Sequence, residues 1–217
     1  MTPATAAVLV AGALLMLLAA AGCGQDDPPS TGPQLVAFGH SFVYGREPDP
    51  DLEPWPSRAG TALGLPVLNQ GVGGAESVDV LEVVRRYTPD PSDTIIVECI
   101  LNDALRHGRA GLDVWRQSVD AILRHLVPGV PAARVLLVLD PPPQGSEQTT
   151  TEGETFLRTL RRYADAGREV AAKHGVRTVD LRVGWDSERD ISEDGLHPND
   201  AGTQRIADVV VRALRRG

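Results

Sequence analysis

Five short apolar runs alternate with longer amphipathic patterns along this chain of 217 residues, and this alternation restricts the possible folds most. Two of the runs, residues 95–97 and 135–139, are apolar at every position, which is typical of strands buried on both faces. Strands that alternate with helices predict a parallel sheet covered by helices on both sides. The expected strands comprise residues 35–38, 67–69, 94–100, 135–139 and 178–181.

The expected helices each carry an apolar stripe on one face. In the clearest case Trp115, Val119, Ile122, Leu123 and Leu126 stand at helical spacing. We therefore predict an α/β fold in which a five-stranded parallel sheet lies between two helical layers, within one domain at residues 34–217. Other helices are expected at residues 55–63, 77–87, 154–174 and 200–215.

The first 22 residues are expected to be an export signal that is removed from the mature protein. Residues 6–22 form an uncharged apolar run that ends in small residues and is short for a membrane span of about 20 residues. The segment from Ala20 to Cys23 resembles the lipobox of bacterial lipoproteins, which implies a lipid on the Cys23 thiol. A lipid-free secretory signal and an uncleaved anchor are the alternatives. We expect an exported protein, either secreted or lipid-anchored on the extracytoplasmic face of the cell membrane.

Composition restricts the rest of the chain and its partners. Residues 23–33 are polar and rich in Pro and Gly, so we expect a flexible tether. The formal net charge of -8 argues against a nucleic-acid partner, because no basic excess is available to neutralise phosphates. Cys99 lies in an apolar run and is expected to be a small buried hydrophobic residue.

Two polar segments far apart in the sequence point to nucleophilic chemistry. Ser41 follows the first expected strand, with Gly39 before it, at the edge where parallel α/β sheets bind ligands. Asp194 and His197 stand three residues apart in a turn near the C-terminus. An imidazole there can deprotonate a serine while the carboxylate orients the ring. Taken alone, a serine after a strand is more often a helix N-cap, and the alternative for Asp194 is that it caps the final helix.

Two further segments can supply hydrogen-bond donors for an oxyanion. The glycine-rich segment 69–75 follows the second strand and offers backbone N–H groups, and Asn102 follows the third strand and offers an amide. A dinucleotide-binding loop is disfavoured, because Gly71, Gly73 and Gly74 do not match G-x-G-x-x-G and do not follow the first strand.

Together these four segments resemble the SGNH (GDSL-type) hydrolase family, whose Ser, Gly, Asn and His occur in this chain order. The resemblance covers essentially the whole mature chain and implies a flavodoxin-like three-layer α/β/α sandwich. It implies Ser41 as nucleophile, His197 as general base and Asp194 as the acid that orients it. It also implies an oxyanion hole formed by the backbone N–H groups of Ser41 and Gly74 and by the Asn102 side chain.

The sequence departs from the family's pattern at two places beside these residues. The family's G-D-S is Gly39-His40-Ser41, and the Gly of its G-x-N-D is replaced by Ile100. We expect His40 to change the turn or the charge near the nucleophile, and Ile100 to shift Asn102.

We predict a serine esterase or lipase-type hydrolase that cleaves a small-molecule or cell-envelope ester through an acyl-enzyme on Ser41, without a metal or cofactor. Its other expected partner is the membrane surface, reached through the lipid anchor. The alternatives are an acyltransferase or deacetylase acting on a cell-envelope sugar, and a non-catalytic binder of glycans or lipids. A metal site formed by His40, Asp194 and His197 is a further alternative. The α/β-hydrolase motif G-x-S-x-G fails because Val43 occupies the final glycine position.

Overall fold

The computed structural model describes residues 32–45, 49–148 and 153–216, all within one compact unit, Thr31–Gly217. The predicted signal peptide, Cys23 and most of the predicted tether lie outside the described residues. In the part of the chain that is described, no helix is long and apolar enough to cross a membrane.

A five-stranded sheet lies at the centre of this unit, with every neighbouring pair of strands parallel. Its strand order, β2-β1-β3-β4-β5, is the flavodoxin-like order, in which ligands bind beyond the carboxyl ends of the strands. All five predicted runs are strands with ends displaced by at most two residues, so the predicted fold class is confirmed. The strands are β1 (Leu35–Gly39), β2 (Val67–Gly71), β3 (Thr94–Glu98), β4 (Val135–Leu139) and β5 (Arg177–Asp180).

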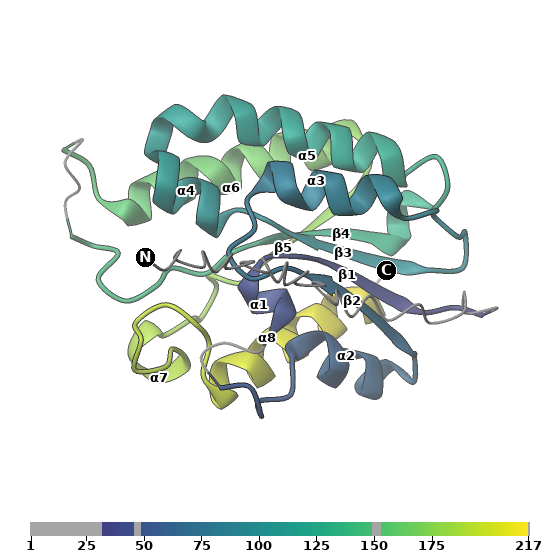
Figure 1. Ribbon diagram of the computed structural model, residues 1–217, viewed down its shortest axis with the longest axis horizontal. Coiled ribbons are helices and arrows are strands. Elements are labelled where there is room, and N and C mark those ends of the chain that lie inside the picture. The colour runs from purple at the N-terminus through teal and green to yellow at the C-terminus, as the bar shows by residue number, and fades with distance from the viewer. Residues whose placement is uncertain (1–31, 46–48, 149–152, 217) are drawn as a thin grey trace, which may run out of the picture. The chain divides into compact units, whose positions relative to one another are not determined.

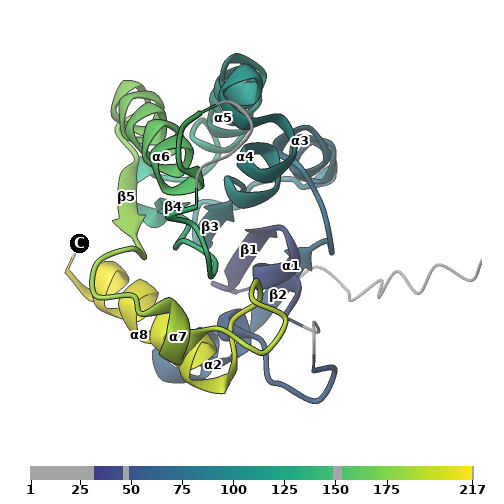
Figure 2. The same cartoon turned by 90° about the vertical axis from the view of Figure 1, so that its left-hand side faces the viewer.

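Helices cover both faces of the sheet (Figures 1 and 2): α3, α5 and α6 lie on one side, and α2 and α8 on the other. The long helices were all expected, whereas α1, α4 and α7 are too short to show a periodic apolar stripe and were not. The helices are α1 (Ser41–Tyr44), α2 (Trp55–Leu63), α3 (Ser77–Arg86), α4 (Leu101–His107), α5 (Leu112–Leu126), α6 (Phe156–Lys173), α7 (Ser187–Asp190) and α8 (Asp200–Arg215).

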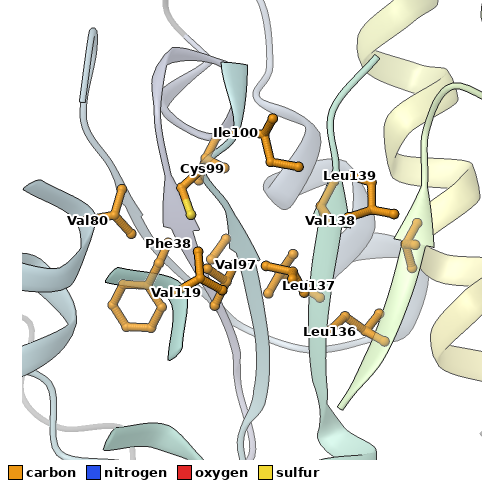
Figure 3. Packing of buried hydrophobic residues seen from close by; sticks show 14 of the residues in the cluster. Phe38, Val80, Val97, Cys99, Ile100, Val119, Leu136, Leu137, Val138 and Leu139 are labelled. Carbon is orange, nitrogen blue, oxygen red and sulfur yellow. The ribbon is translucent and has the colours of Figure 1, made fainter. Parts of the chain in front are cut away.

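The core is built on β3 and β4, which contain the two continuously apolar runs, residues 95–97 and 135–139. Every residue of β4 is buried, and the close-up in Figure 3 shows Leu136 to Leu139 packed beside Val97 of β3. Cys99, next to β3, is buried and free, as expected for a small hydrophobic residue. Its carbonyl oxygen accepts a hydrogen bond of 2.6 Å from the buried Trp115 indole, which satisfies that polar group inside the core.

The carboxyl end of β1 is crowded by its neighbours, and glycines make this crowding possible. A Cβ atom on Gly39 would lie 2.4 Å from the carbonyl oxygen of Glu98 on β3. A Cβ atom on Gly71 would lie 2.2 Å from the backbone nitrogen of Tyr44 on α1. Helix α1 can therefore begin immediately beyond the sheet, packed against β2.

Candidate active site

Ser41 is the first residue of α1 and stands directly beyond the carboxyl end of β1. The preceding residue, His40, is the N-cap of this short helix, and its side chain accepts a hydrogen bond from the Phe42 backbone N–H. Gly45 ends the helix in the left-handed conformation at φ 71°, which favours glycine. The serine is only 5% exposed, so its hydroxyl sits in a largely enclosed position at the ligand-binding edge of the sheet.

His197 and Asp194 lie in the turn between α7 and α8 and meet Ser41 there, 156 residues away along the chain. His197 Nε2 is 3.0 Å from Ser41 Oγ, and His197 Nδ1 is 2.6 Å from Asp194 Oδ2. Because an ionised carboxylate only accepts hydrogen bonds, Nδ1 must carry the proton of the neutral ring. Nε2 therefore accepts the hydrogen bond from the serine hydroxyl, as a general base requires.

Asp194 is held as a carboxylate by the turn around it. Partial burial by itself would raise its pKa, but hydrogen bonds from the Ser192 hydroxyl, from His197 and from the Leu196 backbone N–H lower the pKa well below its ordinary value. The carboxylate thus stays ionised at any ordinary pH. Its function there can be to orient His197 and to stabilise an imidazolium.

Gly74 and Asn102, the predicted oxyanion donors, come together in a second cluster. The Asn102 amide, in the first turn of α4, donates a hydrogen bond of 2.8 Å to the Ala75 carbonyl. Gly74 has φ +70°, and its carbonyl accepts a hydrogen bond of 2.9 Å from Arg106. This loop is joined to the serine's strand because the Val72 N–H donates to the Gly39 carbonyl at 2.9 Å.

A buried aspartate fixes the same two segments relative to each other. Asp103 Oδ1 accepts the Ser77 hydroxyl at 2.6 Å, and Asp103 Oδ2 accepts the Ser77 backbone N–H at 2.7 Å. Burial raises the pKa of Asp103, against the opposing effect of these two hydrogen bonds. The Asn-Asp pair therefore holds the start of α4 against the start of α3.

The two departures from the family's pattern are accommodated inside the protein. Ile100 has φ -100° and ψ -47°, a conformation open to any residue, and its side chain is buried in the core. The expected change of charge near the nucleophile does not reach the surface, because His40 is 1% exposed and points inward to Asp140, with Nε2 to Oδ2 at 2.9 Å.

The metal alternative is not the arrangement found. His40 does not group with Asp194 and His197, because its Nε2 is bonded to Asp140, whereas the ring nitrogens of His197 face Ser41 and Asp194. Among the described residues, the metal-capable group that does form comprises His40, Glu98 and Asp140, with ligand atoms within 4.8 Å of one another.

Sequence reasoning missed several residues that support these clusters: Ser192, Asp103, Arg106 and Asp140. Asp140 had a usable signal, because it is the polar residue directly after the most apolar strand, the same pattern that singled out Ser41. Ser192 and Arg106 had none, since their importance depends on which backbone or carboxylate group the fold brings near them.

A hollow of about 500 Å³ lies beyond β4, and its lining includes none of Ser41, Asp194 and His197. Its walls are the segment 142–147 after β4, Leu157 at the start of α6, and Ser187 and Glu188 at the start of α7. The backbone N–H of Gln144 in this wall donates a hydrogen bond of 3.0 Å to the Gly195 carbonyl. This hydrogen bond joins one wall of the hollow to the turn that carries Asp194 and His197.

A flavodoxin-like sheet with a hydrogen-bonded Ser-His-Asp chain at its carboxyl edge defines a hydrolase-type site. The chain belongs to the GDSL-like Lipase/Acylhydrolase family, which it matches over residues 37–205. This membership supports a hydrolase function of the esterase type.

Solved structures of low sequence identity share the fold. A lipase/acylhydrolase from Enterococcus faecalis has a TM-score of 0.67 at 20% identity, with 85% of this chain and 96% of that chain covered. A lipolytic protein of the G-D-S-L family from Veillonella parvula has a TM-score of 0.66 at 16% identity, with coverages of 86% and 100%. An acetyl xylan esterase from Geobacillus stearothermophilus has a TM-score of 0.64 at 18% identity, with coverages of 85% and 95%. A search of curated proteins returned no match.

Proposed function

We propose that this protein is a serine esterase that cleaves a carboxylic ester through an acyl-enzyme on Ser41. The observation that carries the proposal is the hydrogen-bonded chain from Ser41 through His197 to Asp194. Each member has the partner its role needs: the hydroxyl has a base, and the base has an ionised carboxylate on its far nitrogen.

In the acylation step Ser41 Oγ bonds to the ester carbonyl carbon while its proton moves to His197 Nε2. The tetrahedral intermediate collapses, the bond to the alcohol oxygen breaks, and His197 gives its proton to the leaving alcohol. In the second half a water molecule attacks the acyl carbon and gives a proton to His197. Collapse of that intermediate returns the proton to Ser41 and releases the carboxylic acid.

The oxyanion is proposed to form between the N–H groups of Ser41 and Gly74 and the Asn102 amide. An amide nitrogen carries two hydrogens, and the hydrogen bond to the Ala75 carbonyl uses one of them. The other can be given to the oxyanion. Loss of one such donor costs about 10²- to 10³-fold in rate.

Short acyl esters, including acetylated sugars, are the proposed substrate class. The solved neighbours include an acetyl xylan esterase. This similarity is the reason for proposing a small acyl group on a carbohydrate as the substrate of this protein. We further propose that the protein is exported, that a lipid on Cys23 holds it at the membrane surface, and that it meets its substrate at the cell envelope. These points rest on the N-terminal sequence.

A substrate panel tests this proposal. We expect turnover of p-nitrophenyl acetate, slower turnover of the laurate ester, and release of acetate from acetylated xylo-oligosaccharides. Methanol added as a competing acceptor separates hydrolysis from transfer, since a transferase would form methyl acetate in preference to acetic acid. No turnover of any ester would favour the non-catalytic binder.

A further inference from the structure

Three titratable side chains lie buried at the carboxyl ends of three adjacent strands, next to the nucleophile. His40 follows β1, Glu98 ends β3 and Asp140 follows β4, and their exposures are 1%, 0% and 0%. The reaction proposed above uses none of them. Burying titratable groups costs free energy, so we expect these three side chains to do more than fill space in the core.

The His40 imidazole makes two contacts that together determine its tautomer. Its Nδ1 lies 3.3 Å from the Phe42 backbone nitrogen and accepts that N–H, so Nδ1 carries no proton. Its Nε2 must then be protonated and donates to Asp140 Oδ2 at 2.9 Å. One ring nitrogen therefore caps the helix that starts at Ser41, and the other is hydrogen-bonded to Asp140, directly after β4.

The same oxygen of Asp140 holds the start of α4. Asp140 Oδ2 accepts the backbone N–H groups of Ile100 and Leu101, at 3.1 Å and 2.7 Å. The next residue is Asn102, the proposed oxyanion donor. A single carboxylate oxygen thus connects the turn that carries the nucleophile with the turn that carries Asn102.

We propose that the buried His40–Asp140 pair is a positioning pair, which fixes the Ser41 turn relative to the Asn102 turn so that their donors converge on one oxyanion. This inference rests on the proposed esterase function. It gives His40, the residue that departs from the family's G-D-S, a specific task in this chain.

The third buried group, Glu98, is compatible with a hydrogen bond between His40 and Asp140. Glu98 accepts a hydrogen bond from the Trp55 indole at 3.2 Å, and burial together with the nearby Asp140 charge raises its pKa to about 8. Glu98 therefore keeps its proton to a higher pH than an exposed glutamate does, and its hydrogen-bond partner is the Trp55 indole, whereas the imidazole is bonded to Asp140. A zinc ion held by His40, Glu98 and Asp140 would need its ligand atoms at about 2.0–2.2 Å. Binding it would break the hydrogen bond between His40 and Asp140.

The test uses asparagine and glutamine as partial mimics of histidine at position 40. Asn in H40N can keep the helix cap but is too short to reach Asp140, whereas Gln in H40Q can keep the donor to Asp140. We expect H40N and D140A, which removes the accepting oxygen, to lower kcat for p-nitrophenyl acetate about 10- to 100-fold with KM nearly unchanged. H40Q should retain more kcat than H40N.

A matched control removes a similar pair elsewhere. His174 Nε2 lies 2.9 Å from Asp120 Oδ1, between α6 and α5, and H174N should leave kcat unchanged. Kinetics are compared with thermal unfolding of each variant, so that loss of folded protein is separated from loss of kcat. If H40N and D140A unfold more easily but keep kcat within about twofold, or if H40Q is no better than H40N, the positioning assignment is overturned. If the wild type shows no turnover that depends on Ser41, the esterase proposal fails and this inference fails with it.

Discussion

Replacing Ser41 by alanine should lower kcat for p-nitrophenyl acetate by at least about 10⁴-fold, the largest effect expected of any single substitution in this protein. The variant has no hydroxyl to form the acyl-enzyme, so only the background supplied by binding and the oxyanion donors remains. Substrate affinity should change little, because the serine forms its covalent bond only after the ester is bound. Steady-state kinetics with the wild type and S41A measure this directly.

Ser118 is the matched control for that substitution. It has the same exposure as Ser41, 5%, but lies on α5, where its hydroxyl donates to the Val114 carbonyl within the helix. S118A should keep the kcat of the wild type. If S41A turns over the ester at more than about one-hundredth of the wild-type rate, Ser41 is not the nucleophile.

The second large effect concerns stability, and it arises at Glu98. Burial and the nearby Asp140 charge raise the pKa of this carboxyl to about 8 in the folded protein, against about 4.3 for an unfolded chain. Between these values the folded state binds one more proton than the unfolded state. Stability therefore falls as pH rises through this range, by up to about 1.4 kcal/mol per pH unit.

Glutamine at position 98 removes this dependence, because it resembles the protonated acid and can still accept the Trp55 indole hydrogen. Between pH 5 and pH 8 the free energy of unfolding of the wild type should fall relative to that of E98Q, by up to about 1.4 kcal/mol per pH unit. Urea unfolding at both pH values gives the difference. The control is E82Q, which changes an exposed glutamate on α3 that is paired with Arg85, and which should follow the wild type. An equal pH dependence in wild type and E98Q contradicts a protonated Glu98.

The sequence predicts the sheet well for a physical reason. Strands 95–97 and 135–139 are apolar at every position, and few structures other than a doubly covered parallel strand bury such runs. Helices α2 and α8 have the bounds expected from their apolar stripes. Helices α1 and α4, by contrast, are held by caps and tertiary contacts rather than by a periodic stripe.

The candidate site divides in the same way. Ser41, Asp194 and His197 could be proposed from sequence because Ser41 follows a strand, Asp194 and His197 share a turn, and the four polar segments in this order resemble the SGNH family. The pairing of His40 with Asp140 could not, because it depends on three strand ends meeting and on a side chain that turns inward. A histidine beside the nucleophile suggested a change at the cleft, whereas the structure buries it in the protein interior.

The most direct test of the central claim is to locate a covalent adduct. The wild type is treated with a fluorophosphonate, digested and examined by mass spectrometry, with S118A and S41A treated in parallel. The account predicts one phosphonyl group, on the peptide that contains Ser41, in the wild type and S118A and none in S41A. An adduct on another residue, or an active esterase that takes up no phosphonyl group at Ser41, would contradict it.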